Sequence, residues 1–282
     1  ALLQEKCRTE YALEKAANLR IHTRRSFIEL ELRQTYEYML LLQQQQHFPN
    51  EVILQLVQVL KLAGIPGAEL MGDQLVLIRR LAESMKDIFR WFDADRRSAY
   101  PNLVQVIDDT YYEKAILELI NEVLDERGEV KDQASEALAS IRLNLYRKRN
   151  ELRKEFEKVL RRMQKQGYVT DIEESFLNGR RVVALHAEHK RQVKGILLGE
   201  SDTRRTVFVE PEETIELNNE VFSLENEERR EVQRILKELT ARLSVYAALL
   251  QEYYRIMGEY DFIYAKGRLA IDMQAQLPQL SD

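Results

Sequence analysis

The stretch that decides the fold runs from Asn178 to Glu220, with the sequence NGRRVVALHAEHKRQVKGILLGESDTRRTVFVEPEETIELNNE. Three short runs rich in Val, Ile, Leu, Phe and Thr predict β-strands at Arg180–Ala187, Gln192–Leu198 and Thr203–Val209. The spacers between them, HKR and GESD, carry charge and turn residues. Because the chain on both sides has helical periodicity, we predict a small β insert between long helices.

One long helix is predicted before this insert and another after it. Ser135 is a suitable N-cap for a helix that continues to Gln166, about 45 Å at the usual rise per residue, and Gly167 is suited to end it. Pro211 fits the first turn of the second helix. From there to Tyr264, apolar residues recur every three or four positions, which predicts a helix of about 60 residues with a coiled-coil seam.

The predicted fold is therefore mainly α, with a helical core and two long antiparallel helices that carry a small antiparallel β insert. We divide the chain into an all-α core (1–134), a first long helix or lever (135–167), a β-rich clamp (168–211), and a return helix that rejoins the core (212–282). Within this return helix, the tyrosines are interpreted as core residues, not as stacking platforms. They are Tyr246, Tyr253, Tyr260 and Tyr264.

Shorter helices are predicted along the first part of the chain. Thr23 or Ser26 is the expected N-cap of a helix that ends before Pro49. Further helices are expected over 51–63, 74–92 and 102–124, where apolar residues return at helical spacing.

Charge indicates how the two long helices pair. Residues 137–166 hold ten basic and three acidic groups, a net of +7, whereas residues 212–238 hold nine Glu against four basic groups, a net of −5. We expect the basic helix and the acidic helix to lie antiparallel and to neutralise each other. The alternative is a basic helix face that stays free for nucleic-acid phosphate.

Composition limits the class of protein. The net charge of −5 gives no general attraction to nucleic acid, so binding would need a local patch. Cys7 is the single cysteine, which excludes an intrachain disulfide and fits a reducing compartment. With no signal peptide and no long apolar run, a soluble cytoplasmic protein without membrane contact is expected. Because the chain starts at Ala1 without an initiator Met, we expect a fragment of a longer protein.

Three motifs resemble one family. DERGEVKDQASEALASIR (125–142), NGRRVVALHAEHKRQVKGILLGES (178–201) and TVFVEPEETIELNNEVFSLENEERREVQRILKEL (206–239) are similar to patterns of the MutS family of DNA mismatch-repair ATPases, in its bacterial "MutS two" endonuclease branch. Leu185 stands where that branch usually has Val, and Gly267 where it usually has Ala. The resemblance covers about 115 residues well, and it implies a core, lever and clamp arrangement.

The resemblance also implies what this chain lacks. The family's ATP site is a phosphate-binding loop, and Gly64, Gly67 and Gly72 do not form its GxxxxGK pattern. The nuclease domain of the branch is absent too. We therefore expect no ATPase or nuclease activity and no cofactor in this chain, with ATP and Mg²⁺ bound elsewhere in the parent protein, which would be a homodimer.

Candidate contacts to nucleic acid lie in the clamp insert. Residues 168–211 carry seven basic and seven acidic groups, but the basic ones gather at turns and strand ends, where they suit sequence-independent phosphate contacts. The candidates are Arg180, Arg181, Lys190, Arg191, Lys194, Arg204 and Arg205. Asn218 and Asn219 are poor helix formers and suggest bonds to a neighbouring strand.

Other chemistry is less favoured. His186 and His189 are three apart beside a strand, where alternation would place them on opposite faces, so no metal site is predicted. Asp171, Glu173 and Glu174 are interpreted as a solvated loop.

Two functions remain open. The first is a clamp on duplex, mismatched or branched DNA in repair or in suppression of recombination, with weak, sequence-nonspecific binding. The second is a ribosome-binding arm in translation quality control. A plain coiled-coil scaffold is a third interpretation, but it leaves the inserted strands unexplained. We favour the DNA clamp.

Overall fold

A computed structural model describes residues 2–50 and 56–280, and within them it contains nine α-helices and one four-stranded sheet. The chain divides into two compact units, one made of residues 1–130 and 236–282 and the other of residues 131–235. The predicted boundaries at 135, 168 and 212 all fall inside the second unit. The mainly α fold with a small antiparallel β insert is confirmed.

In the described residues of the first unit the regular elements are helices, and the one β feature is an isolated bridge between Leu124 and Val130. Its α-helices are α1 (Glu10–Ala17), α2 (Arg25–Gln43), α3 (Leu56–Ala63), α4 (Gly72–Trp91), α5 (Ala94–Ala99), α6 (Lys114–Val123) and α9 (Ala247–Asp272), with two short 3₁₀ helices, η1 (Gln4–Lys6) and η2 (Val104–Ile107). The start of the predicted helix 51–63 lies outside the described residues. The helix predicted over 102–124 is wrong as one element, because η2 and α6 are separate.

The α9 helix supplies much of the buried core of this unit. Tyr253 and Tyr260 are fully buried, so their assignment to the core is confirmed. Each hydroxyl has a backbone partner: that of Tyr260 donates to the carbonyl of Leu103 at 3.1 Å, and that of Tyr253 donates to the carbonyl of Tyr111 at 2.9 Å. These bonds remove the cost of burying a phenol in an apolar core.

The helix starts and stops of this unit differ in part from the prediction. The N-cap of α2 is Arg24, which makes no side-chain capping bond, so the expected caps Thr23 and Ser26 are wrong. The predicted 60-residue helix is also wrong, since it is divided into α8 (Glu212–Ser244) and α9. At the break, the hydroxyl of Ser244 donates to the carbonyl of Ala241, and Tyr246 N–H turns back to Leu243. Such local bonds compete with the helical pattern.

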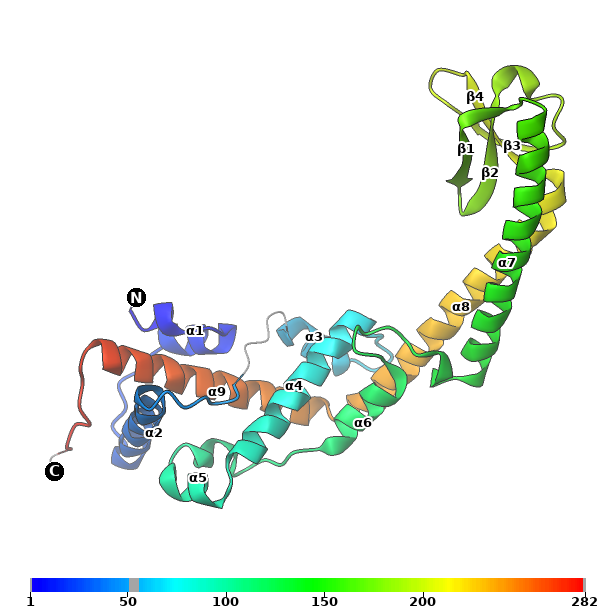
Figure 1. Ribbon diagram of the computed structural model, residues 1–282. Helices are drawn as coiled ribbons and strands as arrows, with labels where there is room; N and C mark the ends of the chain where they lie inside the picture. The colour runs from blue at the N-terminus through cyan, green and yellow to red at the C-terminus, as the bar shows by residue number, and fades with distance from the viewer. Residues whose placement is uncertain (1, 51–55, 281–282) are drawn as a thin grey trace. The chain divides into compact units, whose positions relative to one another are not determined.

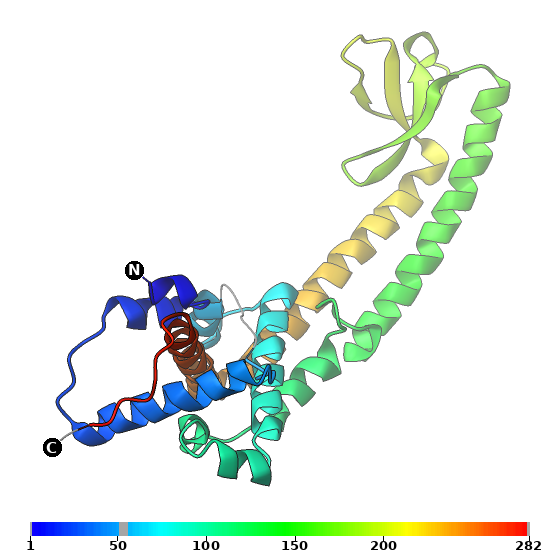
Figure 2. The same cartoon turned by 60° about the vertical axis from the view of Figure 1, so that its left-hand side comes forward.

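The second unit contains α7 (Glu136–Lys165), the first part of α8, and the sheet. The strands are β1 (Val169–Leu177), β2 (Arg180–His186), β3 (Gly195–Glu200) and β4 (Thr206–Pro211), with the 3₁₀ helices η3 (Asp132–Ala134) and η4 (Ala187–His189). All pairings are antiparallel, in the order β1-β2-β4-β3. Figures 1 and 2 show α7 and α8 side by side, with the sheet at one end of the pair.

The ends of α7 follow from local sequence. The hydroxyl of Ser135 accepts the N–H of Leu138 at 2.9 Å, which confirms the predicted N-cap. At the other end Gly167 has φ +71° and closes the helix, with Tyr168 N–H donating to the carbonyl of Met163 and Gly167 N–H donating to that of Gln164. A residue with a side chain is strained at this φ, so glycine suits the position.

Ion pairs confirm the antiparallel pairing of α7 with α8. Toward the C-terminal end of α7, the basic residues pair with glutamates that lie nearer the N-terminal end of α8. The pairs are Arg142 with Glu228 (2.7 Å), Arg149 with Glu225 (2.6 Å), Lys148 with Glu220 (2.6 Å) and Arg162 with Glu213 (2.5 Å). Between them, Leu145, Leu152 and Val221 form a buried seam. The hydrogen bonds to Glu220 and Glu151 raise the pKa of Lys148. The mutual neutralisation predicted from charge thus holds along this face.

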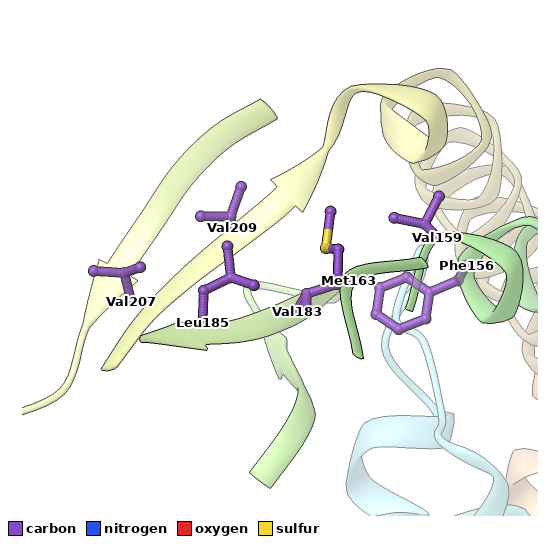
Figure 3. Close-up of a cluster of buried hydrophobic side chains, with 7 residues drawn as sticks. All are labelled: Phe156, Val159, Met163, Val183, Leu185, Val207 and Val209. Atoms are coloured by element: carbon purple, nitrogen blue, oxygen red, sulfur yellow. The ribbon is translucent and has the colours of Figure 1, made fainter. Parts of the chain in front are cut away.

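The sheet packs on the end of α7. Phe156, Val159 and Met163 of the helix form a buried cluster with alternate residues of β2 and β4, as Figure 3 shows. The strand residues in that cluster are Val183, Leu185, Val207 and Val209. Because side chains alternate along a strand, Val182 and Ala184 point to the other face, and they too are fully buried.

The sheet is curled. A Cβ added to Gly199 of β3 would lie 3.3 Å from Cδ1 of Leu177 in β1, although β1 and β3 are at opposite edges of the sheet. The side chain of Leu177 on one edge strand therefore approaches the other edge strand.

Two predictions in the insert need correction. β1 was not predicted as a strand, and Asp171, Glu173 and Glu174, interpreted as a solvated loop, lie on it. Its register against β2 shifts between Val169 and Glu174. In addition, Pro211 is the last residue of β4, paired with Gly195, and the helix begins one residue later.

Candidate nucleic-acid interface

Arg180 is held inside the protein by a polar network. Its guanidinium donates to both carboxylate oxygens of Glu210, at 2.7 and 2.9 Å, and to the side-chain oxygen of Asn219. Glu210 is fully buried and also accepts a bond of 2.8 Å from the amide of Asn218. The predicted bonds from Asn218 and Asn219 to a neighbouring strand are therefore confirmed. The network links β2, β4 and the first turns of α8.

Arg181 is also engaged, on the opposite face of β2. It lies 2.7 Å from the carboxylate of Glu174 on β1, and its guanidinium stacks 4.5 Å above the ring of Phe156 on α7. Only 16% of its side chain is exposed. Both arginines of the NGRR motif thus bind protein groups that fix the strands to the helices, which is a structural task.

The remaining five candidates lie in two segments, 190–194 and 204–205, and Lys194 lies beside the start of α8, since its carbonyl accepts the N–H of Glu212 at 3.2 Å. Lys190 follows η4 and is 3.6 Å from Glu200. Arg191, Lys194, Arg204 and Arg205 are exposed, and among the described residues no ion pair is found for them. A cation without a carboxylate partner is available to an external anion such as a phosphate.

The two segments lie side by side. The turn from Ser201 to Thr206 is closed by a bond of 2.9 Å from Ser201 N–H to the carbonyl of Thr206, and Arg204 within it has φ +57°. Ala187 N–H donates to the carbonyl of Arg205 at 2.9 Å, which fixes η4 against the turn. We call the surface of Lys190, Arg191, Lys194, Arg204 and Arg205 the tip cations.

A second basic surface follows the outer face of α7. At 100° per residue, the positions 147, 154, 158, 161 and 165 cluster on the side opposite to the buried residues of this helix. They carry Arg147, Lys154, Lys158, Arg161 and Lys165, all exposed, and we call them the α7 outer stripe. Two of them have partners on their own helix, Lys158 with Glu155 at 2.8 Å and Arg161 with Glu157 at 3.9 Å.

The α7 outer stripe reconciles two alternatives that the sequence left open. The basic residues that face α8 are neutralised by its glutamates, whereas those on the outer side are not. Cations that pair with α8 and cations that do not pair with it therefore occur on opposite faces of one helix. The sequence does carry a signal for this outer face, namely that positive charges recur at the helical period. The net charge of the whole segment does not show which side of the helix each charge is on.

Metal and membrane chemistry find little support. The strand ends at His186, so alternation does not continue to His189, and the two rings lie 6.4 Å apart instead of on opposite faces. Over the described ranges, no group of three or more His, Cys, Asp or Glu side chains is placed to hold a metal ion. Every helix in those ranges is too short or too polar to span a lipid bilayer.

Comparison with known proteins assigns a family to this arrangement of paired helices and a curled sheet. No protein-family model matches the chain. It is 32% identical over 213 residues to the protein named Endonuclease MutS2 of Carboxydothermus hydrogenoformans, 33% over 211 residues to that of Listeria welshimeri, and 29% over 217 residues to that of Enterococcus faecalis. These matches cover 75–76% of this chain.

The chain belongs to the MutS family, and within it the chain is similar to the MutS2 proteins. It spans 26–27% of the length of these relatives. The resemblance seen in the three sequence motifs is thereby confirmed, and the chain corresponds to a segment of a MutS2-like protein.

Proposed function

We propose that this chain is the non-catalytic core, lever and clamp part of a DNA-binding MutS-family protein. In this proposal it holds duplex, mismatched or branched DNA through contacts to the phosphate backbone, in DNA repair or in suppression of recombination. The observation that carries the proposal is the exposure of Arg191, Arg204 and Arg205 among the tip cations, for which no ion pair is found among the described residues, and the α7 outer stripe supplies further positive charge in the same unit.

The chemistry of these groups determines the kind of binding. Lys and Arg side chains that reach phosphates release condensed counterions, so affinity falls steeply with salt and does not depend on sequence. The net charge of −5 works against association, because the rest of the molecule repels a polyanion. We therefore expect weak, sequence-nonspecific binding by this chain alone, and stronger binding by a dimeric parent that presents two such surfaces.

The proposal includes no catalytic step in this chain. The sequence has no phosphate-binding loop of the type that holds ATP and Mg²⁺, so ATP turnover would belong to another part of the parent. The same holds for nuclease activity. We place the parent in the cytoplasm, which suits a chain whose single cysteine forms no intrachain disulfide. Saturable ATP hydrolysis by the purified chain would contradict this part of the proposal.

The test is a comparison of affinity across DNA structures. The change is Arg191→Gln, Arg204→Gln and Arg205→Gln together, which removes three tip cations without adding negative charge. Affinity for perfect duplex, mismatched duplex and a four-way junction should fall by similar factors, because the contacts are to phosphate. Fluorescence anisotropy with labelled DNA at fixed salt measures the three affinities.

A matched control removes the same charge elsewhere. Lys61, Lys86 and Arg90 are exposed cations of the first unit, and their joint replacement by Gln should change affinity much less. Unchanged affinity of the tip variant would remove the tip as the DNA contact. If the tip variant kept DNA affinity but lost binding to ribosomes, the ribosome-binding interpretation would be preferred.

A further inference from the structure

Three aromatic rings lie in contact in the segment that carries the tip cations. They belong to Tyr168, which precedes β1, to His186 at the end of β2, and to His189 in η4. The ring centroids of Tyr168 and His189 are 4.6 Å apart with an angle of 31° between the planes, and those of His189 and His186 are 6.4 Å apart at 80°. The backbone joins the segments, since His186 N–H donates to the carbonyl of Tyr168 at 2.9 Å.

His189 is the support of this set of rings. Its Nδ1 is 3.0 Å from Oε1 of Gln192, its Nε2 is 3.4 Å from the carboxylate of Glu188, and only 23% of its side chain is exposed. Tyr168 packs against its ring and, in turn, against the buried cluster of the sheet and α7. His189 is therefore held in place and has little surface left for a ligand.

His186 is placed differently. It is exposed, and among the described residues no hydrogen bond or ion pair is found for its ring. Because its plane is nearly perpendicular to that of His189, the contact between the two rings covers at most one face of His186. The ring is a flat surface next to a fixed neighbour, so little conformational entropy is lost when a planar group stacks on it.

The charges around His186 favour a nucleotide strand as the ligand. Thr206 lies directly across the ladder from His186, and the chain neighbour of Thr206 is Arg205, an exposed cation that can hold a phosphate. Glu188, by contrast, is 78% exposed beside His189 and repels phosphate. A strand with a phosphate on Arg205 would therefore place a neutral base, not a second phosphate, against the rings.

We propose that the exposed ring of His186 is a stacking platform for an unpaired base of single-stranded DNA, next to the tip cations. Every base has an aromatic face, so stacking of this kind does not depend on sequence. Bases inside a continuous duplex are covered by their neighbours, so the platform acts only where DNA is unpaired. The inference rests on the proposed DNA clamp, and it adds a contact that distinguishes unpaired DNA from duplex DNA.

The test compares His186→Ala with the original chain on three labelled probes. They are a single-stranded oligothymidylate, a strand of the same length with abasic sites in place of its bases, and a perfect duplex of that length. Affinity for oligothymidylate should fall at least about fivefold, the loss expected for one stacked base. Affinity for the abasic strand and for the duplex should stay within about twofold, because neither offers an unpaired base. Fluorescence anisotropy measures the affinities.

Two further variants test whether the ring itself is responsible. His186→Phe keeps an aromatic ring and should retain most of the affinity for oligothymidylate, whereas His186→Gln keeps a polar group without a ring and should behave like His186→Ala. The matched control is Phe176→Ala, which removes a ring that is 67% exposed at the other end of the β1–β2 pair. It should leave all three affinities unchanged, and circular dichroism checks that every variant is folded.

Three results would overturn the proposal. The first is unchanged affinity of His186→Ala for oligothymidylate, and the second is an equal loss for all three probes, which would mean that His186 contacts phosphate or holds the fold. The third is a dependence on the ring that appears with an oligouridylate strand but not with oligothymidylate. These results leave the proposed clamp standing, because that proposal fails only if the tip variant of Arg191, Arg204 and Arg205 binds duplex DNA as tightly as the original chain.

Discussion

Arg180→Ala removes the guanidinium that faces the buried carboxylate of Glu210. In the intact protein this carboxylate is fully buried and accepts three hydrogen bonds, two from Arg180 and one from Asn218. After the change one bond from the amide remains, and the negative charge has no opposite charge beside it. We expect a large loss of stability of the second unit, because a buried charge without its partner is strongly unfavourable.

The magnitude follows from burial. Removing one partner of a buried ion pair typically costs about 3–5 kcal/mol. Arg180 keeps 25% of its side chain exposed, so water can enter after truncation and solvate the carboxylate in part. We therefore expect the lower end, about 3 kcal/mol, in the free energy of unfolding of this unit. Glu210→Gln in the Arg180→Ala background should recover much of the loss, because a neutral amide is less costly to bury.

Amide hydrogen exchange measures this loss locally. The amides of β2 and β4 should exchange about 100-fold faster in Arg180→Ala, since 1.4 kcal/mol corresponds to a factor of ten. The amides of α9 belong to the other unit and serve as the internal reference. Arg191→Ala is the matched variant, because it removes an exposed arginine of the same insert without an ion pair, and its effect should be within about 0.5 kcal/mol.

The reasoning would be refuted by unchanged exchange in β2 and β4 of Arg180→Ala. It would also be refuted if Arg191→Ala and Arg180→Ala had the same effect on exchange. Either result would mean that the bonds to Glu210 do not hold the sheet to α8.

Three further predictions concern other contacts. Gly258→Ala should destabilise the first unit by about 1–3 kcal/mol in thermal unfolding, because the added Cβ would lie 2.4 Å from the ring of Tyr11. Gly267→Ala is the control and should be nearly neutral, because the atom nearest to its added Cβ is 3.4 Å away. Asp261→Ala should expose residues 2–17 to proteolysis, since this fully buried carboxylate accepts bonds from Arg8 and Thr9; equal cleavage rates would contradict this role. Bonds from Arg234 and Ser135 lower the pKa of Glu231 from 4.5 to about 2. The stability that these bonds give is therefore present above pH 4.5 and is lost as the pH falls toward 2. In Glu231→Gln the melting temperature should depend less on pH between pH 4.5 and 2 than in the original chain.

The features that could be predicted from sequence depend on neighbours along the chain or on a simple sum of charges. The N-cap at Ser135 and the stop at Gly167 are set by local backbone geometry. The antiparallel pairing of α7 with α8 follows from their opposite net charges. Asn218 and Asn219 were found because two poor helix formers inside a helix require a reason, and that reason is the network around Glu210.

The features that were missed depend on tertiary contacts. β1 carries Asp171, Glu173 and Glu174, which hide its strand character, and it becomes a strand because β2 offers it an edge. The break between α8 and α9 could not be predicted, because the sequence there has no Gly or Pro, the residues that usually indicate a helix end. Arg180 and Arg181 have the same sequence signal as the tip cations, and only the positions of Glu210 and Glu174 distinguish them.

The salt dependence of DNA affinity tests the central claim most directly. Each phosphate contact adds about −0.9 to the slope of log affinity against log salt. Replacing Arg191, Arg204 and Arg205 with Gln should make the slope shallower by about 2.7 if all three contact phosphate, and replacing Lys154, Arg161 and Lys165 should also reduce it. The variant of Lys61, Lys86 and Arg90 should keep the original slope. An unchanged slope in both the tip and the α7 variants, or an equal reduction in the control, would contradict DNA binding by the tip cations and the α7 outer stripe.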